Sequence, residues 1–183
     1  LLLLFSVVVF AEKNPFTLPD KPTDRETVAE HIANLRSGAG QSISGDGGKI
    51  WRKAYKELEK IGKPALAPLY DEFDSANWPL RVLIFDLAQD IDTGTVLPFA
   101  RAGMKDSSWQ LRKTIVGGLS RHKNREALEI LVIMLPDSDG VVQAEILKLL
   151  HQWTAKKFGS DKNAWKKWWD KEGPNFDLAG VKE

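Results

Sequence analysis

The side chains that most often carry chemistry are sparse in this sequence. Its three histidines, His31, His122 and His151, have no second ligand at a metal-binding spacing such as H-E-x-x-H. The chain has no cysteine, which excludes disulfides, thiolate metal sites and a cysteine nucleophile. It also lacks the Gly-x-Ser-x-Gly turn that exposes a serine nucleophile. These patterns predict no catalytic, cofactor-binding or metal-ligating residue.

Two segments begin like ligand loops and fail at the deciding position. Residues 137–148 start like a calcium loop, but Lys148 occupies the place of the bidentate glutamate. The segment 37–48 has the glycine spacing of a phosphate loop, but Asp46 stands where lysine is needed. We interpret 37–48, which is rich in Gly and Ser, as a flexible surface loop, with a ligand loop as the alternative.

The charged residues give little further direction. The 183-residue chain has 26 Lys plus Arg and 25 Asp plus Glu, a net charge of +1, which argues against a generally basic nucleic-acid binder. Four carboxylates, Asp71, Glu72, Asp86 and Asp90, fall at helical positions that we expect to be solvated. The alternative is that two of them meet between neighbouring helices and act in acid–base chemistry.

The elements that must position these side chains form a repeat with a period of about 31 residues, which is typical of helical repeat proteins. The segments 64–90, 95–121 and 126–152 align without gaps, and their apolar residues recur at helical spacing. Matching apolar positions include Leu80, Leu111 and Val142, and Ile84, Ile115 and Ile146. Each segment therefore predicts two short amphipathic helices joined by a tight turn. Such pairs bury their apolar faces by stacking, so we expect an all-α fold, an α-solenoid of stacked antiparallel helix pairs.

The repeat also resembles a known family. Arg81 and Arg112 each follow a leucine at the same position of a unit, and Asp106 precedes Arg112 by six residues. This pattern resembles HEAT repeats, particularly the short bacterial HEAT-like type. The resemblance implies a ladder of Asp–Arg contacts between successive turns, which makes Asp106, Asp137 and Arg112 structural. The third unit departs from the pattern, because Gln143 replaces the arginine.

The chain begins with a continuous apolar run at residues 1–10, followed by Ala11. Ten residues are too short to cross a bilayer as a helix, but they suit the apolar region of a secretory signal peptide. We therefore expect a signal peptide at 1–11, truncated at its start, and an extracytoplasmic, periplasmic or secreted protein. A buried N-terminal strand or helix is the alternative.

The remaining boundaries follow from composition and periodicity. We expect an extended linker at 12–23, an N-terminal capping helix pair at 24–61, three repeats at 62–154, and a Trp-rich capping helix with a tail at 155–183. Trp165, Trp168 and Trp169 share one helix face, which would seal the open end of the array. An aromatic platform for sugar or a membrane surface is the alternative. This C-terminal block resembles an element at the end of some exported bacterial HEAT-repeat proteins, which leads us to expect glycine after Thr154, where Ala155 stands.

The second helices provide the candidate binding surface. Phe85, Val116 and Leu147 occupy one equivalent position and are all apolar. They lie near the edge of the buried stripe, so packing between neighbouring repeats is the simpler interpretation. In the other interpretation they form an apolar line that takes a peptide or helix. The flanking candidates in that case are Gln89, Ser120 and His151.

These observations favour a non-catalytic, exported HEAT-like module that binds a protein or peptide partner or acts as a scaffold. They predict no cofactor, no nucleic-acid partner and no membrane span. The alternative is a HEAT-like enzyme, for which the family offers bilin lyases and alkylpurine DNA glycosylases, or a fragment of a larger enzyme. The near-neutral charge argues against the glycosylase, because binding DNA requires a basic groove.

Overall fold

The computed structural model describes residues 13–18, 21–39, 46–74 and 77–179. Within these residues the protein is all-α, with nine α-helices, three short 3-10 turns and no strand. The helices are α1 (Pro22–Gly38), α2 (Asp46–Ile61), α3 (Leu66–Glu72), α4 (Trp78–Ile91), α5 (Val96–Gly103), α6 (Trp109–Leu119), α7 (Arg125–Met134), α8 (Gly140–Thr154) and α9 (Lys162–Lys171). The prediction of an all-α protein is confirmed.

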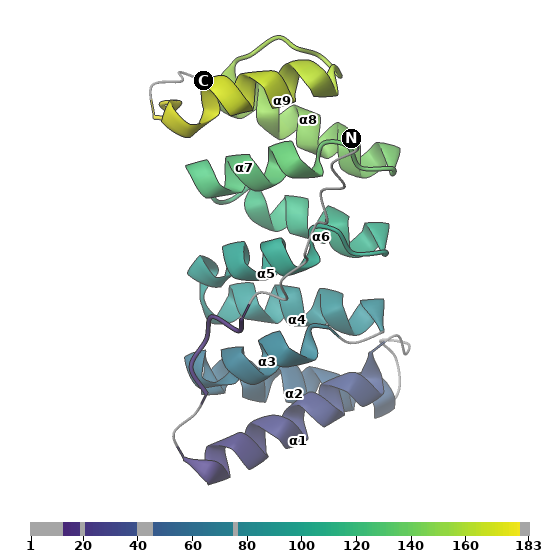
Figure 1. Ribbon diagram of the computed structural model, residues 1–183. Helices are drawn as coiled ribbons and strands as arrows, with labels where there is room; N and C mark the ends of the chain where they lie inside the picture. The colour runs from purple at the N-terminus through teal and green to yellow at the C-terminus, as the bar shows by residue number, and fades with distance from the viewer. Residues whose placement is uncertain (1–12, 19–20, 40–45, 75–76, 180–183) are drawn as a thin grey trace, which may run out of the picture.

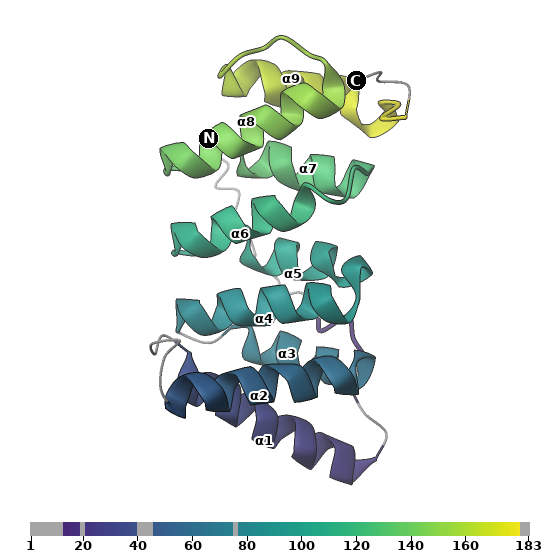
Figure 2. The same ribbon diagram turned by 180° about the vertical axis from the view of Figure 1, so that it is seen from behind.

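The helices lie in two rows that face each other (Figure 1). In the even-numbered row, α2 contacts α4, α4 contacts α6, and α6 contacts α8. In the odd-numbered row, α1 contacts α3, α5 contacts α7, and α7 contacts α9. Figure 2, from the opposite side, places the even-numbered row in front. Helices α4, α6 and α8 begin at Trp78, Trp109 and Gly140, so their starts follow one another at the constant interval of the sequence repeat.

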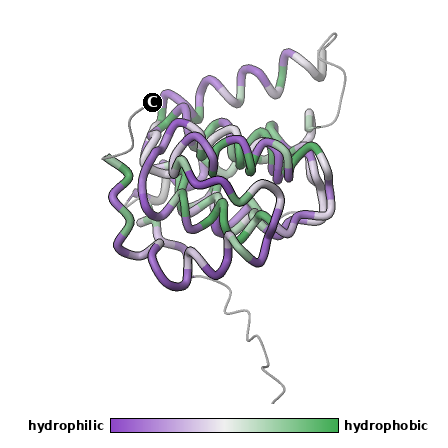
Figure 3. Tube along the Cα trace, turned by 90° about the horizontal axis from the view of Figure 1, so that it is seen from above, coloured by the Kyte–Doolittle hydropathy of each residue, from purple (hydrophilic) through white to green (hydrophobic). Residues whose placement is uncertain are grey.

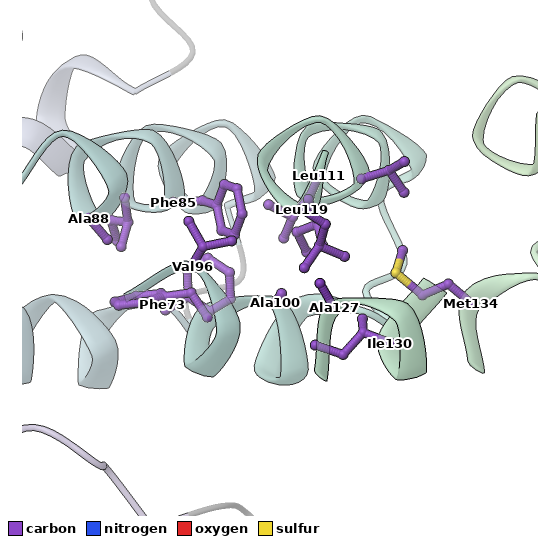
Figure 4. Packing of buried hydrophobic residues seen from close by; sticks show 14 of the residues in the cluster. Phe73, Phe85, Ala88, Val96, Ala100, Leu111, Leu119, Ala127, Ile130 and Met134 are labelled. Carbon is purple, nitrogen blue, oxygen red and sulfur yellow. The ribbon is translucent and has the colours of Figure 1, made fainter. Parts of the chain in front are cut away.

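The core fills the space between the two rows. The repeated positions Leu80, Leu111 and Val142 are fully buried, as are Ile84, Ile115 and Ile146. Figure 4 shows Phe85 and Leu119 of the even-numbered row pointing toward Val96, Ala100 and Ala127 of the odd-numbered row. Seen from above, hydrophobic segments lie among the overlaid helices, and hydrophilic segments occupy many surrounding turns (Figure 3). Burial of one face per helix accounts for the periodicity of the sequence.

Polar side chains fix where several helices begin. Ser108, Asn124, Asp139 and Asp161 are the N-cap residues of α6, α7, α8 and α9, and each accepts a hydrogen bond from a backbone N–H of the first turn. These bonds satisfy donors that have no partner inside the helix. At the end of α8, Ala155 adopts the left-handed conformation, with φ 55°. Glycine favours this conformation, and the family resemblance places a glycine at this same position.

The N-terminal segment packs on the helices rather than lying free as a linker. The side-chain amide of Asn14 donates to the carbonyl of Ala67 at 2.8 Å and to Oδ1 of Asp71 at 2.7 Å. The ring of Phe16 lies 5.6 Å from the rings of both Tyr70 and Phe99. Residues 13–18 therefore run along α3 and α5 and cover part of the odd-numbered row.

Two other expected segments differ from the structure or lie outside it. The Gly/Ser-rich loop expected at 37–48 is shorter, because α1 continues to Gly38 and α2 begins at Asp46. Gly38 suits the close approach of these helices, since a Cβ there would lie 2.5 Å from Cβ of Trp51. Residues 40–45 and the expected signal peptide at 1–11 are outside the described residues.

Candidate binding groove

Two Arg–Asp contacts hold successive turns in register. Nε and Nη2 of Arg81 on α4 lie 2.7 and 2.9 Å from the carboxylate of Asp106, in the turn before α6. Nε and Nη2 of Arg112 on α6 donate to Asp137, before α8, at 2.6 and 2.8 Å. The contacts implied by the family resemblance are thus present. Gln143 replaces the third arginine and donates to backbone carbonyls, including that of Leu135 at 3.3 Å.

The burial and the pKa shift of the Arg112–Asp137 pair are those of a structural ion pair. The Asp137 side chain is only 4% exposed and that of Arg112 is 10% exposed. Burial acts to raise the pKa of Asp137, but hydrogen bonds from Arg112 and from the Asp139 amide outweigh it and lower that pKa. Because the lowered pKa keeps Asp137 charged opposite Arg112, the pair links the two turns as a structural contact.

The six candidate binding residues divide into two groups. Phe85 and Val116 are buried, and Gln89 is 8% exposed. Phe85 packs against α6, where a Cβ at Gly118 would lie 2.8 Å from its ring. The burial of Phe85 agrees with the interpretation that this position packs between neighbouring repeats, and it leaves no surface of the ring for a partner. Leu147 and His151 are half-buried and Ser120 is exposed, so these three remain accessible.

An open groove runs between α6 and α8. Its volume is about 980 Å³. Its lining includes Val116, Gly117 and Ser120 from α6, and Glu145, Lys148 and His151 from α8. Gly117 and Glu145 also line a second hollow of about 490 Å³, which reaches Trp109 at the start of α6. The structure thus brings Val116, Ser120 and His151 together in one groove and places Phe85, Gln89 and Leu147 outside its lining.

Of the four carboxylates expected on solvated faces, Asp71 and Asp90 are exposed, and three of the four contact other elements. The amide of Asn14 reaches Asp71, and the guanidinium of Arg36 pairs with Glu72. On the even-numbered row, the hydroxyl of Tyr55 donates to Oδ2 of Asp90 at 2.6 Å. Asp86, one turn earlier on α4, is half-buried.

Asp86 is the carboxyl with the most perturbed environment in this region. Burial and the neighbouring charge of Asp90 raise the pKa of Asp86 to about 6, against a smaller opposing effect of Arg121. A carboxyl with this pKa exchanges its proton near neutral pH, which general acid–base catalysis also requires. Asp86 lies outside the lining of the groove, and no group of three His, Asp or Glu side chains that could hold a metal occurs within the described ranges.

The Trp-rich helix α9 places its indoles inward. Trp165 is fully buried, Trp168 is 5% exposed and Trp169 is half-buried. Lys166 and Lys167 lie on the exposed side of the helix. The ring of Trp165 lies 5.5 Å from that of His151 on α8. This arrangement favours a cap over an aromatic platform, because the two most buried rings have little surface to offer a ligand.

Sequence reasoning missed two exposed tryptophans of the even-numbered row. Trp78 and Trp109 are 41% and 42% exposed, although tryptophan is usually well buried. They begin α4 and α6 at equivalent positions of successive repeats. The same gapless alignment that revealed the repeat would have paired them. The third unit has Gly140 at this position.

Comparison of the chain with family models, with curated proteins and with solved structures finds no match. Among the described helices, none has the length and apolar character that crossing a bilayer requires.

Proposed function

We propose that this protein is an α-solenoid of HEAT-like helix pairs that binds a protein or peptide segment without catalysing a reaction. The constant register of α4, α6 and α8 supports the architecture, together with the Arg81–Asp106 and Arg112–Asp137 contacts between successive turns. Stacked helix pairs of this kind offer an extended surface lined by equivalent positions of successive repeats.

The observation that carries the proposal is the open groove between α6 and α8. Its lining combines the buried Val116 with polar and charged side chains, among them Ser120, Glu145, Lys148 and His151. The opposite row is partly covered, because Asn14 and Phe16 bind over α3 and α5. A partner that binds the even-numbered row therefore does not have to displace residues 13–18.

Export remains part of the proposal and rests on the sequence alone. The apolar run at 1–10 has the character of a signal-peptide core, and on this ground we propose that the helical part lies outside the cytoplasm. An extracytoplasmic binding or scaffolding module is the role that these features fit together.

Site-specific photocrosslinking in the source cells tests the proposed function. Benzoylphenylalanine at Ser120, in the groove, should form a crosslink to a discrete partner. The matched control is Ala102, an exposed position on α5 of the odd-numbered row, where we expect no such crosslink. Equal crosslinking at the two positions, or none at Ser120, would contradict binding on the even-numbered row.

A further inference from the structure

Helix α6 contains a glycine that packing does not explain. Gly117 and Gly118 are adjacent near its end, although glycine weakens a helix interior more than any residue except proline. Gly118 is needed, because a Cβ there would lie 2.8 Å from the ring of Phe85 and 2.9 Å from Oε1 of Gln89. At Gly117, in contrast, a Cβ would meet no atom within 4 Å.

The position of Gly117 suggests why the helix tolerates it. Gly117 is exposed and lines both the groove and the second hollow beside it, so it lies between the two. Glycine is used where a second backbone approaches closely, because it has no side chain to hold that backbone away. The occupant at this point is therefore slim, which favours an extended segment over a helix. The 11 residues of α6 span about 16 Å, which corresponds to about five residues of extended chain.

The charges along the groove indicate the chemistry of that segment. Lys148 lines the α8 side and Lys123 the end beyond α6, and neither forms an ion pair within the part of the chain that the structure describes. The carboxylate of Glu145 lies 3.8 Å from the ammonium of Lys113, so its charge is partly balanced. The part of the groove near the C-terminal ends of α6 and α8 is therefore positively charged and complements an acidic ligand. At the start of α6, the second hollow exposes the indole of Trp109, which can make an apolar contact with the same ligand.

We propose that the groove between α6 and α8 binds an extended acidic peptide segment whose backbone crosses Gly117 and whose carboxylates meet Lys123 and Lys148. This inference rests on the proposed function and specifies the class of partner. A segment with acidic residues at one end and an apolar side chain near the other matches the two ends of the groove.

Fluorescence anisotropy with three pools of labelled short peptides tests the inference on the full chain. The pools share their apolar positions and carry Asp and Glu, Lys and Arg, or Ser and Gln at the others. We expect the acidic pool to bind at least about tenfold more tightly than the other two, and more weakly as salt increases. The double variant Lys123→Glu, Lys148→Glu should lose at least about tenfold in affinity for the acidic pool. Lys167→Glu on α9, a charge change of the same kind outside the groove, should bind as the wild type does.

Substitutions at Gly117 test the path of the backbone. Gly117→Ala should raise the melting temperature, because alanine favours the helix and meets no neighbour, and should weaken binding of the acidic pool. Gly117→Trp should abolish binding while circular dichroism shows a folded protein. An unchanged affinity in Gly117→Ala and in Gly117→Trp would overturn the inference.

The possible outcomes separate this inference from the proposed function. If the neutral or basic pool binds best and Gly117→Trp abolishes that binding, the groove binds peptides and the acidic partner is wrong. If no pool binds, or if binding survives both Gly117→Trp and the double lysine variant, peptide binding by the groove is wrong as well.

Discussion

Replacing Trp165 by alanine should destabilise the protein more than any surface substitution on the same helix. Trp165 is fully buried in α9. Its ring meets those of Phe158 and Trp168 edge to face, at centroid distances of 5.0 and 5.8 Å. Its indole N–H donates to the carbonyl of Gly159 at 3.0 Å. The substitution therefore removes apolar burial, ring contacts and a hydrogen bond at the end of the stack.

The magnitude follows from the buried area. A buried tryptophan removes about 200 Å² from water, which is worth about 5 kcal/mol at roughly 25 cal/mol per Å². Residual burial in a compact unfolded chain lowers this to about 3–4.5 kcal/mol. The lost hydrogen bond adds about 1 kcal/mol, and the burial that the alanine side chain retains offsets a similar amount. We expect Trp165→Ala to lower the free energy of unfolding by about 4 kcal/mol, within the range of about 3–5 kcal/mol typical of such truncations.

Urea unfolding followed by far-ultraviolet circular dichroism measures this change without relying on tryptophan fluorescence. Trp109→Ala is the matched control, because Trp109 is 42% exposed and should change stability by less than about 1 kcal/mol. If Trp165→Ala unfolds within about 1 kcal/mol of the wild type, α9 does not stabilise the stack and the cap interpretation fails. An unchanged stability together with lost sugar or lipid binding would favour the aromatic platform.

Three further substitutions test other parts of the structure. Ala155→Gly should increase the free energy of unfolding by about 0.5–1 kcal/mol and raise the melting temperature, because Ala155 has φ 55° and glycine adopts this conformation without strain. A lower melting temperature would contradict this expectation. Arg112→Ala should cost about 3 kcal/mol in urea unfolding because it leaves the buried Asp137 carboxylate unpaired, and Asp137→Asn in the same chain should recover part of the loss; no recovery would contradict the pairing. Asp86 keeps its proton in the folded protein up to a pKa of about 6, against 3.8 ordinarily, so its contribution to stability falls as pH rises between these values. The full shift corresponds to about 3 kcal/mol, which partial solvent exposure reduces to about 1 kcal/mol. Asp86→Asn should gain about that much at pH 7, and an unchanged slope of melting temperature against pH would contradict the assignment.

The helices and their register could be predicted because one physical requirement repeats along the chain. Each helix buries one face, so Leu80, Leu111 and Val142 recur at a constant interval and are all buried in the structure. The N-cap residues Ser108 and Asp139 have a similarly local cause, since each accepts a hydrogen bond from a backbone N–H of its own helix. The left-handed conformation of Ala155 was not predicted, although a glycine was expected at that position from the resemblance of the C-terminal block.

The candidate site was harder to predict because equivalent positions have different neighbours. Phe85 and Leu147 occupy the same place in the repeat, but only Phe85 is fully buried. Helix α6 lies beside α4 and offers Gly118 to the ring of Phe85. No described helix continues the even-numbered row beyond α8, so Leu147 stays half-exposed. Periodicity specifies which face of a helix is apolar, whereas burial at its edge depends on the next element.

The N-terminal segment breaks the symmetry between the two rows, and this asymmetry bears on where a partner binds. A ligand on α3 and α5 would have to displace Phe16 from Tyr70 and Phe99, and also break the hydrogen bonds of Asn14. Each aromatic pair is worth about 0.5–1.5 kcal/mol beyond its buried area, so this displacement opposes binding. Binding in the groove between α6 and α8 does not carry this cost of displacing residues 13–18, because that segment lies along the other row. Residues 13–18 thus cover part of the odd-numbered row, whereas they leave the groove between α6 and α8 accessible to a partner.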